Sequence, residues 1–332
     1  MLNQLDLIFL KKGEAVDHFL VIRKCELRSR KDNRGQFLVL ELGDKSAAVN
    51  SNMWENFEQV YPGMKCGDIV KVDGIMDDYQ GAPQIKITNI RTAVAEDNVL
   101  RSDLMPRSKR DPFEMKAEFT ARIEKISDYK LRMLMRLIFN EKNMIKFSTA
   151  PAGKSWHHSY IHGLIEHTLE IIKICDLMCD LHPDLNRDLL ICGAMMHDYG
   201  KTEELSYDTF FEYTDKGKLL GHIVIAAIIV DEEAKKIPDF SEELKDCLIH
   251  LILSHQGKLE YASPVVPKTV EAIALYQADE LSAKVNAYKN AINTEIRSDG
   301  KWTKFLNIVS TDLFNHGLTS EIEEEIKKTL FD

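Results

Sequence analysis

The first third of the chain alternates apolar and polar residues with the period of two that is typical of β-strands. Turn residues such as Pro62-Gly63 separate these stretches. The pattern predicts five strands, at 17–28, 37–44, 45–51, 68–80 and 83–91, with one interposed segment at 53–61. Five short strands of this kind predict a small closed β-barrel.

From Phe113 onward the spacing changes to three and four, which is the period of helices packed by one face. Between the two regions, residues 96–112 lose all periodicity and contain two prolines, which predicts an exposed linker. The predicted fold is therefore multidomain: an N-terminal β-barrel at 1–95, a linker at 96–112, and an all-α helical bundle with a C-terminal extension at 113–332.

The composition fits this two-domain arrangement. The chain has 332 residues, of which 44% are hydrophobic and 29% charged, as in a globular protein with a real core. The longest apolar run, 223–230, is too short to cross a membrane, and the N-terminus has no signal-peptide pattern. Six cysteines without paired spacing fit a reducing compartment. We expect a cytoplasmic protein that does not enter a membrane.

The net charge of −10 argues against nucleic-acid binding until it is divided along the chain. Residues 1–95 hold 13 Lys+Arg and 13 Asp+Glu, so this part is neutral and the remainder, 30 against 40, carries the whole −10. Basic residues gather around the first predicted hairpin: Arg23, Lys24, Arg28, Arg30, Lys31 and Arg34.

Trp54 and Tyr79 are candidates for stacking on nucleic-acid bases, whereas Phe37 opens an apolar strand and is expected in the core. With the stretch GDIVKVDGIMDDYQGAPQIKI, this region resembles an OB-fold of the kind found in nucleic-acid-binding proteins. The resemblance implies a platform for single-stranded nucleic acid. The alternative for each residue is a solvated hairpin charge or a core aromatic.

Six polar residues stand on apolar helical faces in the second part of the chain. A lone histidine in such a row is more often a hydrogen-bonded core residue, but five helices each deliver an inward His or Asp. Imidazoles and carboxylates without thiolates suit manganese, iron, cobalt or magnesium better than a structural zinc. Six ligands exceed the need of one ion and predict two. The ligand set is His167, His197, Asp198, His222, His255 and Asp279.

Three further residues accompany the His197-Asp198 pair. If the helix persists, Lys201 projects to the same face as the pair, and Gly200 would let a phosphate approach the backbone. His157 and His158 precede the first ligand helix; they are candidates for holding the terminal nucleotide, with a polar helix start as the alternative.

The order H…HD…D, with SWHHSYIHGLIEHTLEI, HDYGK, KGKLLGHI and LSHQGKLEYASP, resembles the HD-domain superfamily of metal-dependent phosphohydrolases. With an OB-fold before it, the chain is similar to the YhaM family of 3′ to 5′ exoribonucleases. The resemblance implies that Asp198 and Lys201 are catalytic and that 5′-nucleoside monophosphates are released from single-stranded RNA, with DNA as a further substrate.

The same resemblance divides the ligand set between two ions, with manganese preferred. His167, His197, Asp198 and Asp279 hold one ion, and His222 and His255 contribute to the second. The chain departs from the family at Gln256, where a second histidine is common, and at His162, where glycine is common. Gln256 puts occupancy of the second site in question. Oligomers are common in such enzymes, so a homo-oligomer is one option here.

Two other functions stay open from the sequence. One is an HD-domain hydrolase of free or cyclic nucleotides in which the barrel is regulatory. The other is a nucleic-acid-binding adaptor whose helical half is a degenerate scaffold, although the intact ligand set argues against it.

Overall fold

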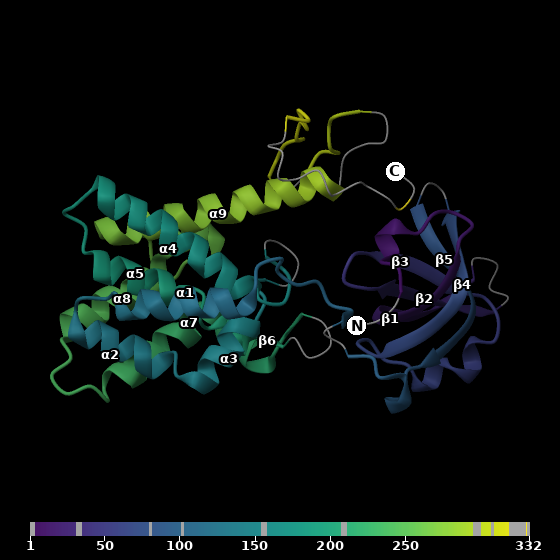
Figure 1. Cartoon of the computed structure of the whole chain (residues 1–332), viewed down its shortest axis with the longest axis horizontal. Helices are drawn as coiled ribbons and strands as arrows, with labels where there is room; N and C mark the ends of the chain where they lie inside the picture. Colours follow the sequence, from purple (N-terminus) through teal and green to yellow (C-terminus); the bar gives the residue numbers. More distant parts are fainter. Residues whose placement is uncertain are drawn as a thin grey trace. The chain divides into compact units, whose positions relative to one another are not determined.

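The computed structural model describes residues 4–30, 35–79, 82–100, 103–153, 158–206, 211–294, 300–306, 309–318 and 330. The chain divides into two compact units (Figure 1). One unit groups Met1–Pro106 with Ala291–Asp332, and the other groups Arg107–Tyr207 with Phe211–Asn290.

The first unit contains a closed five-stranded barrel with the strand order β1-β2-β3-β5-β4. β1 pairs with both β2 and β4, and β3 closes the barrel by pairing parallel with β5. This connectivity is that of an OB-fold, so the predicted fold of this region is confirmed. The strands are β1 (Ala15–Ser29), β2 (Gln36–Gly43), β3 (Ala48–Met53), β4 (Ile69–Tyr79) and β5 (Ala82–Thr92).

Alternate side chains of the strands fill the barrel, as the period of two requires. Leu20, Ile22, Leu40 and Val72 are fully buried within one apolar cluster. The register between β4 and β5 shifts between Asp73 and Gly74, with Thr88 as the extra residue on β5. A Cβ atom at Gly74 would lie 2.4 Å from the Lys86 carbonyl oxygen. Glycine therefore permits the close approach of β4 and β5 that bends the sheet around the core.

The stretch predicted as an exposed linker contains both exposed and buried side chains in its described part. A 3₁₀ turn covers Ala95–Asp97, and Leu104 and Met105 are only 2% and 6% exposed. Arg107 forms a bridge to Ile161, and Arg110 pairs with Glu118. The two buried apolar side chains, Leu104 and Met105, fix part of this stretch in place. Two neighbouring apolar residues are too few to give a periodic pattern, so the sequence did not reveal their burial.

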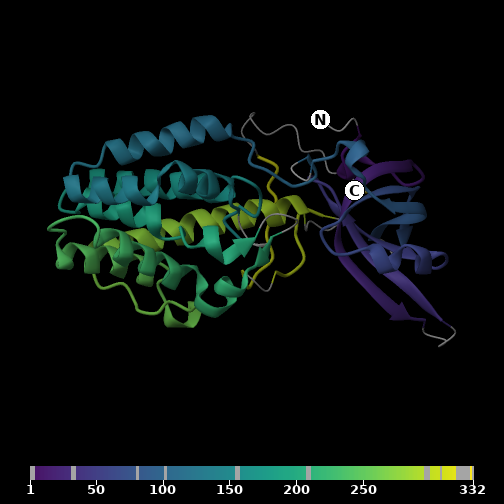
Figure 2. The same cartoon turned by 90° about the horizontal axis from the view of Figure 1, so that it is seen from below.

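The second unit is a helical bundle, seen from two directions in Figures 1 and 2. A single apolar cluster runs through its helices. They are α1 (Pro112–Glu124), α2 (Tyr129–Ile138), α3 (Glu141–Thr149), α4 (Gly163–Leu181), α5 (Arg187–Met196), α6 (Lys201–Glu204), α7 (Asp215–Ala234), α8 (Glu242–Ser254) and α9 (Val270–Thr294). A two-stranded hairpin, β6 (Leu205–Ser206) with β7 (Glu212–Tyr213), precedes α7.

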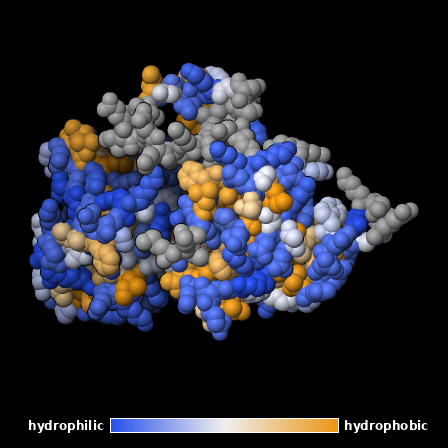
Figure 3. Space-filling view, turned by 45° about the vertical axis from the view of Figure 1, so that its right-hand side comes forward, coloured by the Kyte–Doolittle hydropathy of each residue, from blue (hydrophilic) through white to orange (hydrophobic). Residues whose placement is uncertain are grey.

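The apolar run 223–230 on α7 is only partly buried, because Val224 and Ile228 are 36% and 43% exposed. At the start of α9 the Thr269 hydroxyl accepts a hydrogen bond from the Ala272 N–H. No helix in the described part of the chain is long and apolar enough to cross a membrane. On the face shown in Figure 3, apolar residues form several separate patches among hydrophilic ones.

Candidate active site

Five helices bring the six-residue ligand set to one place in the bundle. His167 lies on α4, His197 and Asp198 follow the end of α5, and Asp279 lies on α9. His222 lies on α7 and His255 follows the end of α8. The backbone of α7 leaves the helical region at Gly221 (φ 71°), a conformation that suits glycine, and this kink sets the direction of His222.

Three ligand atoms form a first cluster around the Nε2 atom of His167. This atom lies 3.1 Å from Asp279 Oδ1 and 3.3 Å from His197 Nε2, and His197 Nε2 lies 4.0 Å from Asp279 Oδ1. One carboxylate oxygen and two imidazole nitrogens at this spacing are a suitable set for a divalent ion.

Asp198, His222 and His255 form a second cluster of the same kind. Asp198 Oδ1 lies 3.4 Å from His222 Nε2 and 3.7 Å from His255 Nε2. Its other oxygen, Oδ2, lies 3.4 Å from His197 Nε2 and 3.7 Å from His167 Nε2. Asp198 is therefore the residue that faces both clusters.

The hydrogen bonds of two histidine rings leave their other nitrogens free to bind cations. The Nδ1–H groups of His197 and His255 donate to the carbonyls of Ala194 (2.8 Å) and Ile252 (2.6 Å). Each Nε2 atom is then a lone-pair donor directed into the site. Asp198 Oδ1 and His222 Nε2 are buried without a hydrogen-bond partner among the described residues. Buried orphan atoms are costly, and a cation between them would remove that cost.

Burial and charge set the ionisation of this site. Burial, with the neighbouring His197, lowers the pKa of His255 to about 4, so its imidazole is neutral near pH 7. Burial also lowers the pKa of His167. Although burial raises the pKa of Asp198, the Lys201 ammonium and His197 outweigh it and hold the pKa well below the ordinary value. Burial lowers the pKa of His197, but Asp198 and Asp279 outweigh it and raise that pKa. A metal ion binds to the neutral imidazole, so binding here would displace a proton from His197.

Lys201 reaches Asp198, but not because the helix continues. α5 ends at Met196, a turn spans 197–200, and Lys201 begins the short helix α6. Lys201 Nζ donates to Asp198 Oδ2 and to the Ala152 carbonyl, both at 2.6 Å, and its side chain is 10% exposed. The structure gives Gly200 a packing role: a Cβ atom there would lie 2.1 Å from the His222 carbonyl oxygen, so only glycine lets α7 pack this closely.

Exposure indicates the side from which a substrate can approach. The side chains of His167, His197 and His255 are fully buried, and that of Asp198 is 3% exposed. Asp279 and His222 are 14% and 17% exposed. Asp279 and His222 are therefore the members of the ligand set that solvent, and so a substrate, can reach most easily.

Gln256 and His162, the two departures from the family pattern, have different consequences. The Gln256 side-chain amide lies 3.1 Å from His255 Nε2, so it competes with an ion for that lone pair. His162 adopts φ 70° before α4 and its Nδ1 lies 2.6 Å from the Ser148 carbonyl oxygen. His162 therefore has a structural hydrogen bond, while Gln256 belongs to the second cluster.

His157 lies outside the described residues, and His158, the other candidate for holding the terminal nucleotide, is buried. His158 is 1% exposed, its φ is 44°, and its Nε2 lies 3.4 Å from Glu170 Oε2. Its carbonyl accepts from the N–H groups of Ala152 and Tyr160. A Cβ atom at Gly163 would lie 2.0 Å from this carbonyl oxygen, which explains the glycine at the start of α4.

Glu204 is a site residue that sequence reasoning missed. It lies on α6, and its carboxylate accepts from the backbone N–H of His222 (3.0 Å) and from His222 Nδ1 (3.0 Å). Burial raises the pKa of Glu204, but His222 outweighs this and lowers it, so the carboxylate stays ionised. The second acidic residue after the HDYGK motif was the only signal, and it does not reveal a partner 18 residues away.

The aromatic candidates of the barrel are largely exposed. Trp54 is 50% exposed and Tyr79 61% exposed. Phe37 is a correction: it is only half-buried and stacks on Trp54, with ring centroids 4.3 Å apart and an interplanar angle of 13°. The Arg30 guanidinium lies 5.4 Å from the Trp54 ring centroid and donates to the Trp54 carbonyl at 2.7 Å.

The basic candidates of the hairpin have intramolecular partners. Arg23 donates to the Asp44 carbonyl at 2.8 Å, and Arg28 pairs with Glu26 at 2.7 Å. Arg34 and Lys31 lie outside the described residues. Arg30 also has such a partner, but it lies beside the exposed Trp54 ring and so joins a positive charge to a stacking surface.

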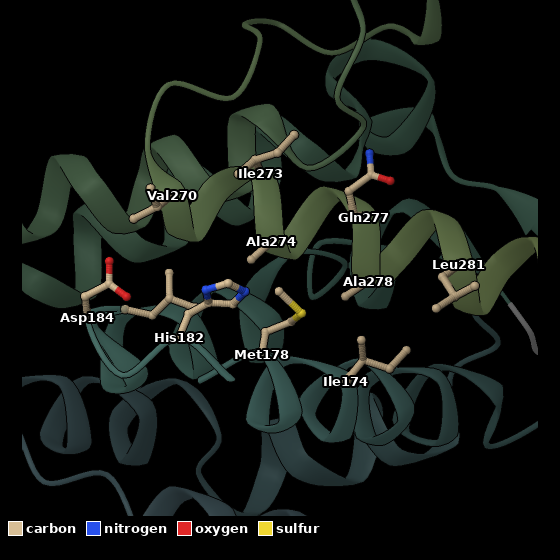
Figure 4. Close-up of a pocket in the computed structure, with 11 residues that line it drawn as sticks. Ile174, Met178, His182, Asp184, Val270, Ile273, Ala274, Gln277, Ala278 and Leu281 are labelled. Carbon is tan, nitrogen blue, oxygen red and sulfur yellow. The ribbon is translucent and has the colours of Figure 1, made fainter. Parts of the chain in front are cut away.

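A cavity of about 370 Å³ lies between α4 and α9, with Ile174 and Met178 on one side and Ala274 on the other (Figure 4). Its lining is mostly apolar, with His182, Asp184 and Gln277 as the polar residues. None of the ligand set lines it, so this cavity is separate from the two clusters.

Comparison with known proteins agrees with this architecture. Residues 164–284 match the family model described as "HD domain". One relative is the 3′-5′ exoribonuclease YhaM of Bacillus subtilis (strain 168), 34% identical over 84% of this chain and 88% of the relative. The protein of the same name from Listeria monocytogenes serotype 4b (strain CLIP80459) gives the same three values.

Among solved structures, the second OB-fold domain of replication protein A from Methanococcus maripaludis covers 26% of this chain and 92% of its own. Its sequence identity is 22% and its TM-score 0.23. An OB-fold barrel in one unit and an HD domain in the other define a hydrolase of the HD superfamily. The identity and coverage of the relatives show more: the chain belongs to the YhaM family of 3′-5′ exoribonucleases.

Proposed function

We propose that this enzyme is a two-metal nuclease that removes 5′-nucleoside monophosphates one at a time from the 3′ end of single-stranded RNA. Single-stranded DNA is a second polymer that the same site would accept. Manganese is the proposed ion, with magnesium, cobalt or iron as alternatives, because the ligand set has imidazole and carboxylate groups and no thiolate. A cytoplasmic location is part of this proposal, and the six free cysteines support it because reduced thiols are typical of that compartment.

The observation that carries this proposal is the position of Asp198 between two clusters. Its Oδ1 faces His222 and His255, and its Oδ2 faces the histidines of the first cluster. A carboxylate that faces both clusters would be able to bind one ion in each of them. When bound, the ions would supply a nucleophilic water and neutralise charge on the phosphoryl oxygens.

The protein's own residues orient this site. Lys201 is proposed to be catalytic through Asp198: its ammonium keeps the carboxylate ionised and fixes its Oδ2. Glu204 fixes the ring of His222, and backbone carbonyls fix His197 and His255. Asp279 lies on the more open side of the site, where a phosphodiester has access.

The barrel accounts for preference for a polymer. A phosphodiesterase site holds one linkage, whereas trimming requires that a strand be held while its end is advanced. The exposed rings of Trp54 and Tyr79 offer stacking surfaces that accept any base. Arg30 beside Trp54 adds a positive charge for the backbone.

The test is digestion of a 5′-labelled single-stranded RNA with manganese, comparing wild type with Asp198→Ala. We expect a ladder that shortens from the 3′ end in wild type and an intact RNA with the variant. Asp184→Ala is the matched control, since Asp184 is exposed and outside both clusters. An intact RNA with wild type, together with hydrolysis of free or cyclic nucleotides, would replace this proposal with the nucleotide hydrolase.

A further inference from the structure

A polar cluster outside the ligand set lies beside His167. It consists of Glu170 on α4, Ser282 on α9 and His158 before α4. Glu170 is three residues after His167 and Ser282 is three residues after Asp279, so each lies one helical turn from a residue of the first metal cluster. The cluster therefore lies next to the first metal cluster, where a scissile phosphate would bind.

Two donors hold the carboxylate of Glu170 by one oxygen. The Ser282 hydroxyl donates to Glu170 Oε2 at 2.8 Å, and His158 Nε2 lies 3.4 Å from the same atom. No hydrogen bond to Oε1 is found in the described part of the chain, and the Glu170 side chain is 42% exposed. One oxygen is fixed by the protein, while the other is available to a ligand.

The contacts of Glu170 favour a hydrogen-bond donor as that ligand. Its Oε2 accepts from the Ser282 hydroxyl and faces His158 Nε2, as the oxygen of an ionised carboxylate does. An ionised carboxylate only accepts hydrogen bonds, so its ligand must donate them. The nearest donors on a 3′-terminal nucleotide are the two ribose hydroxyls, which lie one sugar ring beyond its phosphate.

We propose that Glu170 accepts hydrogen bonds from the 2′,3′-diol of the 3′-terminal ribose and so makes the site prefer RNA ends to DNA ends. The inference rests on the proposed function. The 2′-hydroxyl is the group by which a protein distinguishes the two polymers, and a carboxylate is a usual acceptor for ribose hydroxyls. Ser282 and His158 are positioning residues that act through Glu170.

A third metal ion is the competing explanation, because His158, His167 and Glu170 also lie within metal-ligand spacing of one another. His167 already directs Nε2 toward Asp279 and His197. Its remaining nitrogen, Nδ1, lies 3.4 Å from the Ser282 hydroxyl. An ion in this cluster would need both nitrogens of one imidazole to be deprotonated, which disfavours it against a diol.

The experiment compares the affinity of the manganese-loaded enzyme for adenosine 5′-monophosphate and for its 2′-deoxy analogue by calorimetry, in wild type and Glu170→Gln. A hydrogen bond to a charged group makes wild type prefer the ribonucleotide about tenfold or more. The variant is expected to bind both ligands equally and to keep the manganese content of wild type. The matched control is Glu166→Gln, on the same helix, whose carboxylate accepts from the Tyr160 hydroxyl.

A kinetic measurement extends the test to the polymer. An RNA with one 2′-deoxynucleotide at its 3′ end should lose its last residue about tenfold more slowly than an all-RNA substrate, and Glu170→Gln should remove that difference. A 3′-phosphorylated RNA places a negative charge against Glu170, so the variant should process it relatively better than wild type.

The outcomes separate this inference from the proposed function. Equal wild-type affinity for the two nucleotides overturns the diol contact even if RNA is trimmed normally, and this holds whether or not the variant folds. A manganese loss in Glu170→Gln would identify the cluster as a third metal site instead. If RNA is not trimmed but the ribonucleotide preference exists and depends on Glu170, the proposed exonuclease fails while the ribose contact stands.

Discussion

The buried pair of Lys201 and Asp198 gives a prediction whose size follows from the structure. The two charged atoms lie 2.6 Å apart, and the side chains are 10% and 3% exposed. Removing one partner of a buried pair leaves an uncompensated charge and costs about 3–5 kcal/mol. Lys201→Met, which keeps most of the side-chain volume, should lower the free energy of unfolding of the metal-free protein by about this amount.

Thermal unfolding in the presence of a chelator measures the effect. A loss of 3–5 kcal/mol corresponds to a decrease in Tm of roughly 6–20 °C for a unit of this size. Manganese should reduce the difference in Tm between the variant and wild type, because a bound cation would replace the positive charge that Asp198 loses with Lys201. The RNA-trimming rate should fall as well, since Asp198 loses the donor that fixes Oδ2.

Lys245→Met is the matched control. Lys245 has a similarly covered side chain, 9% exposed, but its partners Glu242 and Asp231 are 81% and 36% exposed. Water can solvate these carboxylates when the lysine is removed, so the control should lose much less stability. Equal losses in the two variants, or a Lys201→Met deficit that manganese leaves unchanged, would refute this account of Lys201.

Three further predictions follow from other parts of the structure. Glu204→Gln should weaken manganese binding at the second cluster about 10–100-fold by calorimetry; Glu203→Gln, whose partner is exposed, should not. In metal-free protein, His255 binds a proton less readily when folded, so unfolding free energy should fall by about 3 kcal/mol as pH decreases from 6.5 to 4; a flat profile contradicts this. Trp54→Ala should weaken RNA binding by about 1–3 kcal/mol, as measured by fluorescence anisotropy. An equal loss of RNA affinity with Trp302→Ala, which removes a similarly exposed ring, would argue against a stacking site at Trp54.

The sequence alone determined the secondary-structure elements of this enzyme and the candidate metal ligands. All five strands occur where the period of two predicts them, and His167, His197, His222 and His255 each stand in or beside an apolar helical stripe. A residue in such a stripe faces the core wherever the helix packs, because periodicity is a property of one element. The order of these residues along the chain was sufficient to suggest both the family and the metal chemistry.

Only the tertiary structure decided which groups meet. Glu204 supports His222, Ser282 meets Glu170 from a helix 112 residues away, and Gly200 makes room for the α7 backbone. Phe37, placed in the core by its strand pattern, stacks on Trp54 instead. Periodicity shows which face of an element is turned inward, but the opposing atom belongs to another element, and packing of the whole unit fixes that pairing.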